Sequence, residues 1–282
     1  MVYVARINGY WEQAGLEVQT SSFSTGRLAI DALLGHAASF SNAAVTPLAL
    51  AALQSTGFRI ISQLSVSPNE LSIIVRRSSN VRSPADLARK RIGYPIGTQA
   101  EYFFDKYLAV HRLDKRDMII VSAAPPDCVT AIGNGEVDAI VTFKPHSLNA
   151  LRLLGNNGEA LDTRGLYTSI ASMICATAVS DNEPATVRAI LRGLIEAERF
   201  IAREPQRAIA IVANEVGLEP AALARYFHEY SFRAVLSGEL LAALRAEGEW
   251  GARKRRSAAQ VDYRGLIADR HLRSIDPGRV HI

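Results

Sequence analysis

The sequence predicts an α/β protein made of two α/β units, with parallel or mixed sheets flanked by helices and a helical C-terminal segment. Three observations predict this fold class. The chain has 282 residues, 48% hydrophobic and 21% charged, which is ordinary globular composition and enough for about two domains. Between residues 16 and 143, short runs with the two-residue period of strands alternate with runs of helical period. From residue 184 the spacing is helical almost to the end of the chain.

The expected strands are short segments in which apolar residues alternate with polar ones or form a continuous run. In residues 16–20, for example, Leu16 and Val18 alternate with polar residues and would point to the same face of a sheet. In chain order the predicted strands are 16–20, 39–41, 59–66, 71–76, 91–94, 118–121, 137–143 and 172–179.

Capping residues mark several helix starts. Thr46 is a favourable N-cap, and Pro47 suits the first helical turn. The same pairing recurs at residues 83–84, and Thr98 stands three residues before Glu101, which is capping-box spacing. The predicted helices cover 25–34, 98–110, 126–132, 184–203, 205–215, 220–230, 238–249 and 261–272, and others begin near 46, 84 and 146.

No motif in the sequence indicates catalysis. There is no Gly-x-Ser-x-Gly elbow, no phosphate-binding loop and no His-Glu-x-x-His motif. The six histidines are scattered without zinc-ligand spacing, and Cys128 lies in a helical pattern as a buried, inert thiol would. Cys175 is the only other cysteine, so a disulfide scaffold is excluded. We therefore expect no enzymatic activity, no metal and no cofactor.

Hydropathy and charge exclude further classes. No apolar run approaches the about 18 residues of a membrane span, and no signal peptide is recognised before the fold-like sequence that begins at Met1. The formal net charge of +4 permits an anionic partner without requiring one. The basic run 253–256 has no helix-turn-helix or aromatic platform around it, so we expect a solvated linker and no nucleic-acid partner.

Four predicted helix starts directly follow predicted strands and carry small polar residues. Open α/β sheets bind ligands at the carboxyl ends of their strands, and helix N-termini add free N–H groups and a positive dipole end. These starts predict a cleft for a small ligand, although capping alone also explains Ser24, Thr46 and Thr98. Lys144 and Phe143 offer a cation and an aromatic face, or else a solvated lysine beside a core phenylalanine. The four starts are 24–26, 42–47, 97–99 and 125–127.

A series of short motifs runs through nearly the whole chain. It opens with Asn-Gly-Tyr-Trp-Glu-Gln-Ala-Gly-Leu-Glu-Val at residues 8–18. In order and spacing these motifs resemble the substrate-binding proteins of ABC importers of the nitrate/sulfonate/taurine type, a group that includes thiamine-pyrimidine-precursor binders. The later motifs are 83–87 with 91–93, 97–103, 135–139 and 143–146. Proteins of this group carry an export signal and a first strand before the opening motif, so this chain looks truncated at its N-terminus.

The resemblance implies a two-lobed periplasmic-binding-protein fold of type 2. Lobe one would comprise residues 1–76 and 170–282, lobe two residues 77–169, and the hinge would lie near 72–76 and 172–179. A small solute would bind between the lobes, and closure would present the protein to the transmembrane subunits of an ABC permease. Such proteins are periplasmic or cell-surface monomers. The ligand-binding residues that the resemblance implies are Ser41, Asn42, Thr46, Ser67, Asn69, Thr98, Gln99, Thr142, Phe143 and Lys144.

Several functions stay open at this point. The helix N-termini and Lys144, which replaces an acid usual in the group, favour a small organic anion such as a sulfonate, taurine or nitrate. A pyrimidine precursor or an aromatic carboxylate is the alternative ligand. An enzyme on the same fold is disfavoured, because the related pyrimidine-precursor synthase uses a cysteine-rich motif that is missing here. A ligand-sensing regulator would need an upstream helix-turn-helix.

Overall fold

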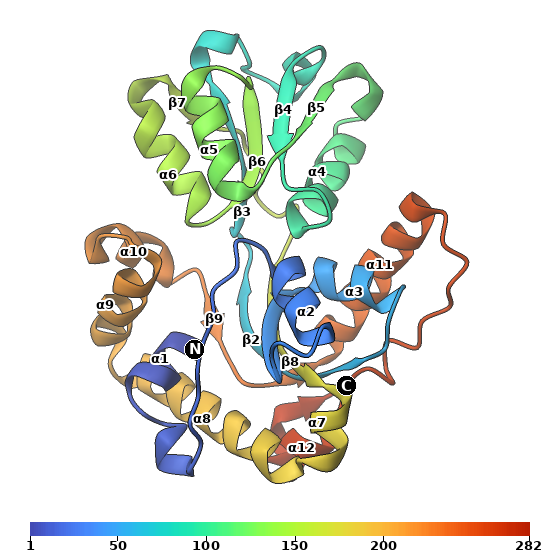
Figure 1. Ribbon diagram of the computed structural model, residues 1–282. Coiled ribbons are helices and arrows are strands. Elements are labelled where there is room, and N and C mark those ends of the chain that lie inside the picture. Colours follow the sequence, from blue (N-terminus) through green and yellow to red (C-terminus); the bar gives the residue numbers. More distant parts are fainter. The chain divides into compact units, whose positions relative to one another are not determined.

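The computed structural model describes residues 1–282, and the chain divides into two compact units (Figure 1). Unit 1 comprises residues 1–67 and 170–282, and unit 2 comprises residues 68–169. Each unit contains its own sheet and its own hydrophobic core. None of the helices combines the length and the apolar character that crossing a membrane requires.

Unit 2 contains a mixed five-stranded sheet with the order β5-β4-β6-β3-β7. Strand β4 runs parallel to β5 and β6, whereas β3 runs antiparallel to β6 and β7. Alternate residues of a strand point to opposite faces. Ile73 and Val141 therefore pack with α4, while Ile74 and Ile140 pack with α5 and α6 on the other face. The bounds are β3 (Leu71–Arg76), β4 (Arg91–Tyr94), α4 (Gln99–Val110), β5 (Ile119–Ser122), α5 (Pro125–Asn134), β6 (Ala139–Phe143), α6 (His146–Leu154) and β7 (Gly158–Ala160).

Unit 1 contains a four-stranded sheet with the order β1-β8-β2-β9 and a short parallel pair, β10 and β11. Strand β1 pairs antiparallel with β8 and forms one edge of the sheet. Its strands are β1 (Phe40–Ala44), β2 (Phe58–Ser67), β8 (Ser169–Ala176), β9 (Ser231–Phe232), β10 (Leu236–Ser237) and β11 (Val280–His281). Its helices are α1 (Val2–Ile7), α2 (Gly26–Leu34), α3 (Val45–Ala52), α7 (Thr177–Asn182), α8 (Pro184–Arg203), α9 (Pro205–Val216), α10 (Pro220–Phe227), α11 (Gly238–Arg255) and α12 (Asp269–Arg273).

In the core of unit 1, Trp11 packs directly against α8. The Trp11 ring is buried, and its Nε1 donates a hydrogen bond to the carbonyl oxygen of Ile190, 3.1 Å away. A Cβ on Gly193 would lie 2.3 Å from the same ring, which is far inside van der Waals contact. Glycine is therefore required at residue 193 so that the indole can lie directly on the helix backbone.

Most of the predicted helix starts are confirmed. Thr25 caps α2 by accepting a hydrogen bond from the backbone N–H of Leu28. Ser83 and Asp86 form a capping box, although the helix that follows is a single 3₁₀ turn, Pro84–Leu87. These signals are local, so they need no partner from elsewhere in the chain.

The predicted strand at 16–20 is wrong, because this segment is irregular in the structure. Leu16 and Val18 still pack against the core of unit 1, so their alternation reflects side-chain burial without a strand partner. The predicted helix at 261–272 is also wrong over its first part. Residues 261–268 are irregular, and Ile267 forms an isolated parallel bridge with Ile60 of β2.

The unit boundary and two helix ends also differ from the prediction. Strand β3 belongs to unit 2, because it pairs with β6 and β7, so the first crossing between units follows Ser67 and precedes residues 72–76. Helix α3 has Ala44 at its N-cap, which places Thr46 inside the first turn. The basic run 253–256 is the last turn and C-cap of α11 and not a linker.

Candidate binding site

The loop between β4 and α4 is held by its own side chains. Thr98 is the N-cap of α4; its Oγ1 accepts from the N–H of Ala100 and donates to the carbonyl oxygen of Pro95, 2.8 Å away. Glu101 reaches back, and its Oε2 accepts a hydrogen bond from the N–H of Gly97 at 2.8 Å. The Thr98 hydroxyl and the Glu101 carboxylate thus have structural partners within the loop. A ligand contact from the Thr98 hydroxyl stays a prediction.

Gln99, the first residue of α4, has donors that no protein atom uses. The residue is 8% exposed, and its Oε1 accepts a hydrogen bond from Ser169 Oγ at 2.7 Å. Its Nε2 has no acceptor in the protein, and the backbone N–H groups of Thr98 and Gln99 have none either. Three N–H donor groups without a protein acceptor therefore belong to the first residues of a helix of 12 residues, where the dipole is positive.

The carboxyl end of β6 carries a second set of buried polar groups. The hydroxyls of Thr142 and of Ser147, in the first turn of α6, are buried and have no hydrogen-bond partner. A buried hydroxyl without a partner costs about 1–3 kcal/mol, so such groups are rare in a folded protein. Phe143 lies edge-on to His146, with ring centroids 5.7 Å apart, and burial lowers the pKa of that imidazole.

Lys144 and Asn69, two predicted site residues of unit 2, are joined by a hydrogen bond. Lys144 Nζ donates to the carbonyl oxygen of Asn69 at 2.7 Å, and the Lys144 N–H donates to Glu70 O. The ammonium group thereby fastens the end of β6 to the turn between β2 and β3.

Three predicted site residues of unit 1 lie on or next to the sheet edge formed by β1. Ser41 and Asn42 are on β1 opposite Ile174 and Met173, and Asn42 is exposed. Thr46 is fully buried in α3, and its Oγ1 donates a hydrogen bond to the buried carboxylate of Glu247 on α11. This bond joins two helices of the core, so the helix-start pattern at Thr46 reflects packing as well as any contact with a ligand.

The remaining unit 1 residue, Ser67, is the buried last residue of β2. The sequence analysis did not single out two buried serines of β8. Ser172 on β8 is fully buried, faces Ala43 in the register and has a hydroxyl without a partner. Ser169 orients Gln99 from 70 residues away. No local signal marks either residue, because serine in an apolar strand is common.

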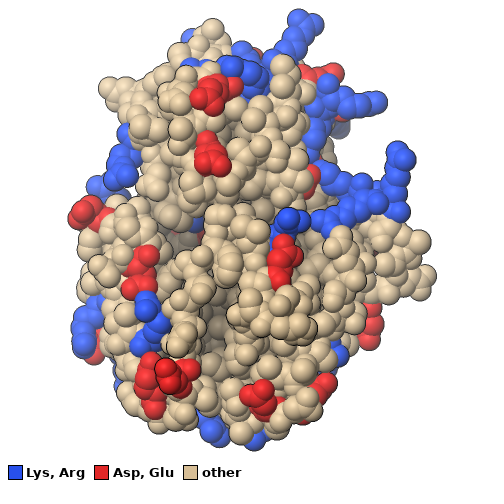
Figure 2. Space-filling model, viewed as in Figure 1, with Lys and Arg blue, Asp and Glu red and all other residues tan.

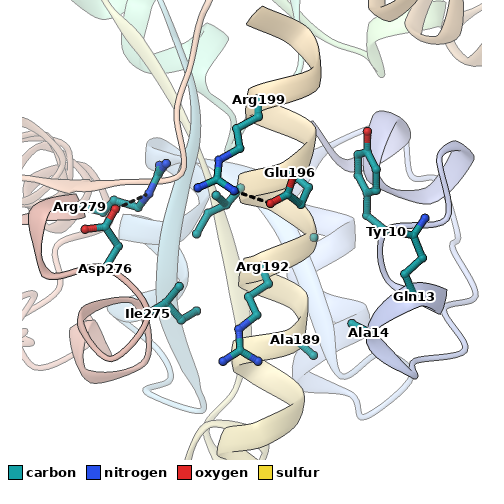
Figure 3. Close-up of a pocket in the computed structure, with 12 residues that line it drawn as sticks. Tyr10, Gln13, Ala14, Ala189, Arg192, Glu196, Arg199, Ile275, Asp276 and Arg279 are labelled. Carbon is teal, nitrogen blue, oxygen red and sulfur yellow. Dashed lines mark hydrogen bonds and ion pairs between the residues drawn. The ribbon is translucent and has the colours of Figure 1, made fainter. Parts of the chain in front are cut away.

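A cavity of about 620 Å³ lies in unit 1 beside the exposed face of α8 (Figure 3). Arg192 points into it without an ion-pair partner, whereas Arg199 pairs with Glu196 and Arg279 pairs with Asp276. None of the ten predicted ligand-binding residues lines this cavity, which is instead lined by Tyr10, Gln13, Ala14, Ala189, Arg192, Gly193, Ile195, Glu196, Arg199, Ile275, Asp276 and Arg279.

The titratable groups of both units show few features of nucleophilic or metal chemistry. Cys128 and Cys175 are free and buried, and burial raises the pKa of each thiol to about 12, so both are protonated at neutral pH. No group of three or more His, Cys, Asp or Glu side chains is arranged to hold a metal ion. What the buried residues do offer is hydrogen bonding, mainly from amide and hydroxyl groups.

Comparison with solved structures confirms the predicted fold. The alkanesulfonate-binding protein SsuA from Xanthomonas axonopodis pv. citri, bound to MOPS, superimposes with a TM-score of 0.83 at 22% identity, over 95% of this chain and 94% of that one. The desulfurization enzyme DSZB superimposes with a TM-score of 0.70 at 16% identity, over 98% and 96% of the two chains. This periplasmic-binding-protein fold is therefore shared by binding proteins and by an enzyme.

Sequence comparison identifies the family. The taurine-binding periplasmic protein of Escherichia coli (strain K12) is 24% identical over 195 residues, which are 68% of this chain and 60% of that protein. A binding protein of Brucella abortus (strain 2308) is 26% identical over 227 residues, 78% of this chain and 68% of that protein. The family model described as NMT1/THI5 like matches residues 1–208. The chain thus belongs to the NMT1/THI5-like family.

Proposed function

We propose that this protein is the solute-binding component of an ABC import system and that it captures a small organic anion, such as an alkanesulfonate or taurine. The observation that carries the proposal is the set of unused donors at the N-terminus of α4: Gln99 Nε2 and the backbone N–H groups of Thr98 and Gln99. Thr98 and Gln99 are buried residues, and the N–H groups that begin a helix have no partner within it, so we propose that an acceptor outside the chain binds there.

The chemistry of the donors favours an anion over a neutral ligand. All three donor groups are N–H groups, and the dipole of α4 adds a positive potential at the same point. A sulfonate presents three acceptor oxygens and no donor, which matches this set. Thr142, with its buried unpaired hydroxyl, supplies a further donor for the same ligand in our proposal.

The relatives support the same assignment. Two curated relatives are named for taurine and for aliphatic sulfonates, and both come from Escherichia coli (strain K12). By analogy with the periplasmic relative, we propose a periplasmic or cell-surface location, with delivery to the transmembrane subunits of a permease. Ser41, Asn42, Ser67, Asn69 and Lys144 remain proposed contributors to binding.

A second candidate ligand is a pyrimidine precursor. One relative, from Haemophilus influenzae, is named for thiamine biosynthesis and is 26% identical over 216 residues. The half-buried Phe143 ring beside His146 offers a surface on which a heterocycle can stack.

Calorimetric titration with taurine, alkanesulfonates, nitrate and aminopyrimidines tests the proposal. The variant Gln99→Leu removes the amide and should weaken sulfonate binding about 10-fold or more, because a hydrogen bond to a charged group contributes about 1.5–3 kcal/mol. Gln206→Leu makes the same change at an exposed residue of α9 and should leave affinity unchanged. Binding of aminopyrimidines alone, or equal affinity for sulfonate in both variants, would contradict the anion proposal.

A further inference from the structure

The last turn of α11 carries a cluster of basic residues that the proposed solute site does not use. This cluster, which we call the basic tip, consists of Arg253, Lys254, Arg255 and Arg256. The chain has 32 basic and 28 acidic residues, so the other 28 basic residues balance the acidic ones in number. The four positive charges of the basic tip thus equal the formal net charge of +4 in number.

The basic tip extends beyond the packed part of its helix. Leu244, Glu247 and Gly251 are the buried face of α11, and a Cβ on Gly251 would lie 2.3 Å from a Leu50 methyl carbon. Beyond Gly251 the four basic residues are all exposed. Figure 1 shows the end of α11 and the coil after it extending away from the sheet of unit 1, and Figure 2 shows Lys and Arg side chains gathered there.

The three arginines of the basic tip are only weakly neutralised by acidic side chains. Arg253 approaches Glu249 at 4.0 Å with both side chains 73% exposed, and Lys254 lies over the Trp250 ring, 5.1 Å from its centroid. Arg255 and Arg256 make no ion pair or side-chain hydrogen bond. No acidic residue occurs between Trp250 and Val261.

The helix dipole accounts for only part of this cluster. Cations in the last turn of a helix are stabilised by the dipole; Arg253, Lys254 and Arg255 lie in that turn, whereas Arg256 is the C-cap that follows it. Arg256 is the C-cap and has a left-handed backbone with φ of 51°, a conformation that favours glycine at helix ends.

We infer that the basic tip is a docking surface for an anionic phospholipid bilayer. Four consecutive residues at about 100° intervals surround the helix end, so they suit a plane met end-on better than a groove met along one helical face. Three of them are arginines, whose guanidinium groups bind phosphate oxygens in pairs. Trp250 lies beneath Lys254 and is not a free stacking platform for a base. The choice of a bilayer over nucleic acid also rests on the proposed import function, which acts at a membrane.

Co-sedimentation of the full chain with vesicles tests this inference. Binding is expected to vesicles of phosphatidylcholine mixed with phosphatidylglycerol and not to phosphatidylcholine alone. Each basic residue near an anionic bilayer raises partitioning about five-fold, so changing all four to Gln should lower it roughly 100-fold or more. Raising ionic strength from about 0.1 M to about 1 M, which shortens the Debye length from about 10 Å to about 3 Å, should also abolish binding.

A matched variant distinguishes an effect of the basic tip from an effect of the protein's net charge. Arg112→Gln, Arg152→Gln, Arg203→Gln and Arg225→Gln together remove the same charge from exposed, scattered positions and should retain most of the binding. Equal loss in both variants would overturn the proposal, as would failure of the unaltered protein to bind anionic vesicles. Binding to a DNA duplex through the basic tip without binding to vesicles would also overturn it.

A smaller variant and a solute titration guard against misfolding and separate the two proposals. Arg255→Gln with Arg256→Gln changes only side chains without contacts, should fold normally, and should lower vesicle binding about 25-fold. Solute titration of the same variant should be unchanged, so a failure of the proposed solute function would be seen separately from a failure of membrane docking.

Discussion

Ser169 donates a hydrogen bond to Gln99 Oε1 at 2.7 Å, although the two residues are 70 positions apart in the chain. This bond occupies the amide oxygen of Gln99 and leaves its Nε2 as the donor available to a ligand. The binding chemistry that we propose therefore depends on a residue that contributes no predicted ligand contact of its own.

We predict that Ser169→Ala weakens sulfonate binding about five-fold and lowers the free energy of unfolding by about 1 kcal/mol, because one buried hydrogen bond is lost. Calorimetric titration and urea unfolding measure the two effects. Ser122→Ala removes an exposed serine hydroxyl from β5 and should change neither. Full affinity in Ser169→Ala would show that the Gln99 amide is oriented without this bond.

Thr142→Val should raise the stability of the unliganded protein by about 1–2 kcal/mol while it weakens solute binding. The reason is that the Thr142 hydroxyl is buried without a partner, and removing such a group ends its desolvation cost. Ser147→Ala, in the first turn of α6, removes the other buried unpaired hydroxyl and tests whether its loss also raises stability. Loss of stability in Thr142→Val, measured by urea unfolding, would mean that the hydroxyl is satisfied in the free protein.

Gly193→Ala should destabilise unit 1 by about 3 kcal/mol, because a methyl group 2.3 Å from the Trp11 ring forces the indole out of its position. Thermal unfolding and Trp fluorescence report the change. At Gly238, in the first turn of α11, the nearest atom to an added Cβ is 3.7 Å away, so Gly238→Ala should be neutral or slightly stabilising. Equal stability of the two variants would disprove the packing argument.

Stability should fall as the pH is lowered through about 6.5, and His271 should account for part of the loss. His271 is buried, its Nε2 lies 3.1 Å from Ser180 Oγ, and burial together with Arg270 and Arg188 lowers its pKa from 6.5. The unfolded chain therefore binds a proton before the folded one does, so the neutral imidazole stabilises the fold above pH 6.5. That contribution is lost between pH 6.5 and the lower pKa of the folded state.

Urea unfolding at several pH values checks this prediction. In His271→Asn, the free energy of unfolding should vary less with pH between neutral and mildly acidic conditions. His228→Asn, at an exposed position, should leave this pH dependence unchanged. His146, whose pKa burial also lowers, contributes in the same direction, so some dependence should remain in His271→Asn. If the free energy of unfolding of His271→Asn depended on pH as steeply as that of the unaltered protein, His271 would not be a source of the pH dependence.

The sequence was informative wherever the signal was local. Thr98 was predicted both as a cap and as a site residue, and the structure shows the cap directly. Gln99 was predicted from its place at a helix start, and its burial and unused donors support the proposal made for it. Thr46 had the same signal, but its hydroxyl is bonded to Glu247, a partner 201 residues away that no local pattern could reveal.

The amino-acid sequence by itself determined the alternation of strands and helices, the capped helix starts and the family of this protein, because capping and hydrophobic period depend on residues a few positions apart. The tertiary structure decided that residues 16–20 remain irregular, that β3 belongs to unit 2 and that Ser169 orients Gln99. Each of these depends on pairing between distant segments. Such pairing depends on which distant segments meet in the folded chain. The hydrophobic period or the capping residue of one segment does not specify its distant partner.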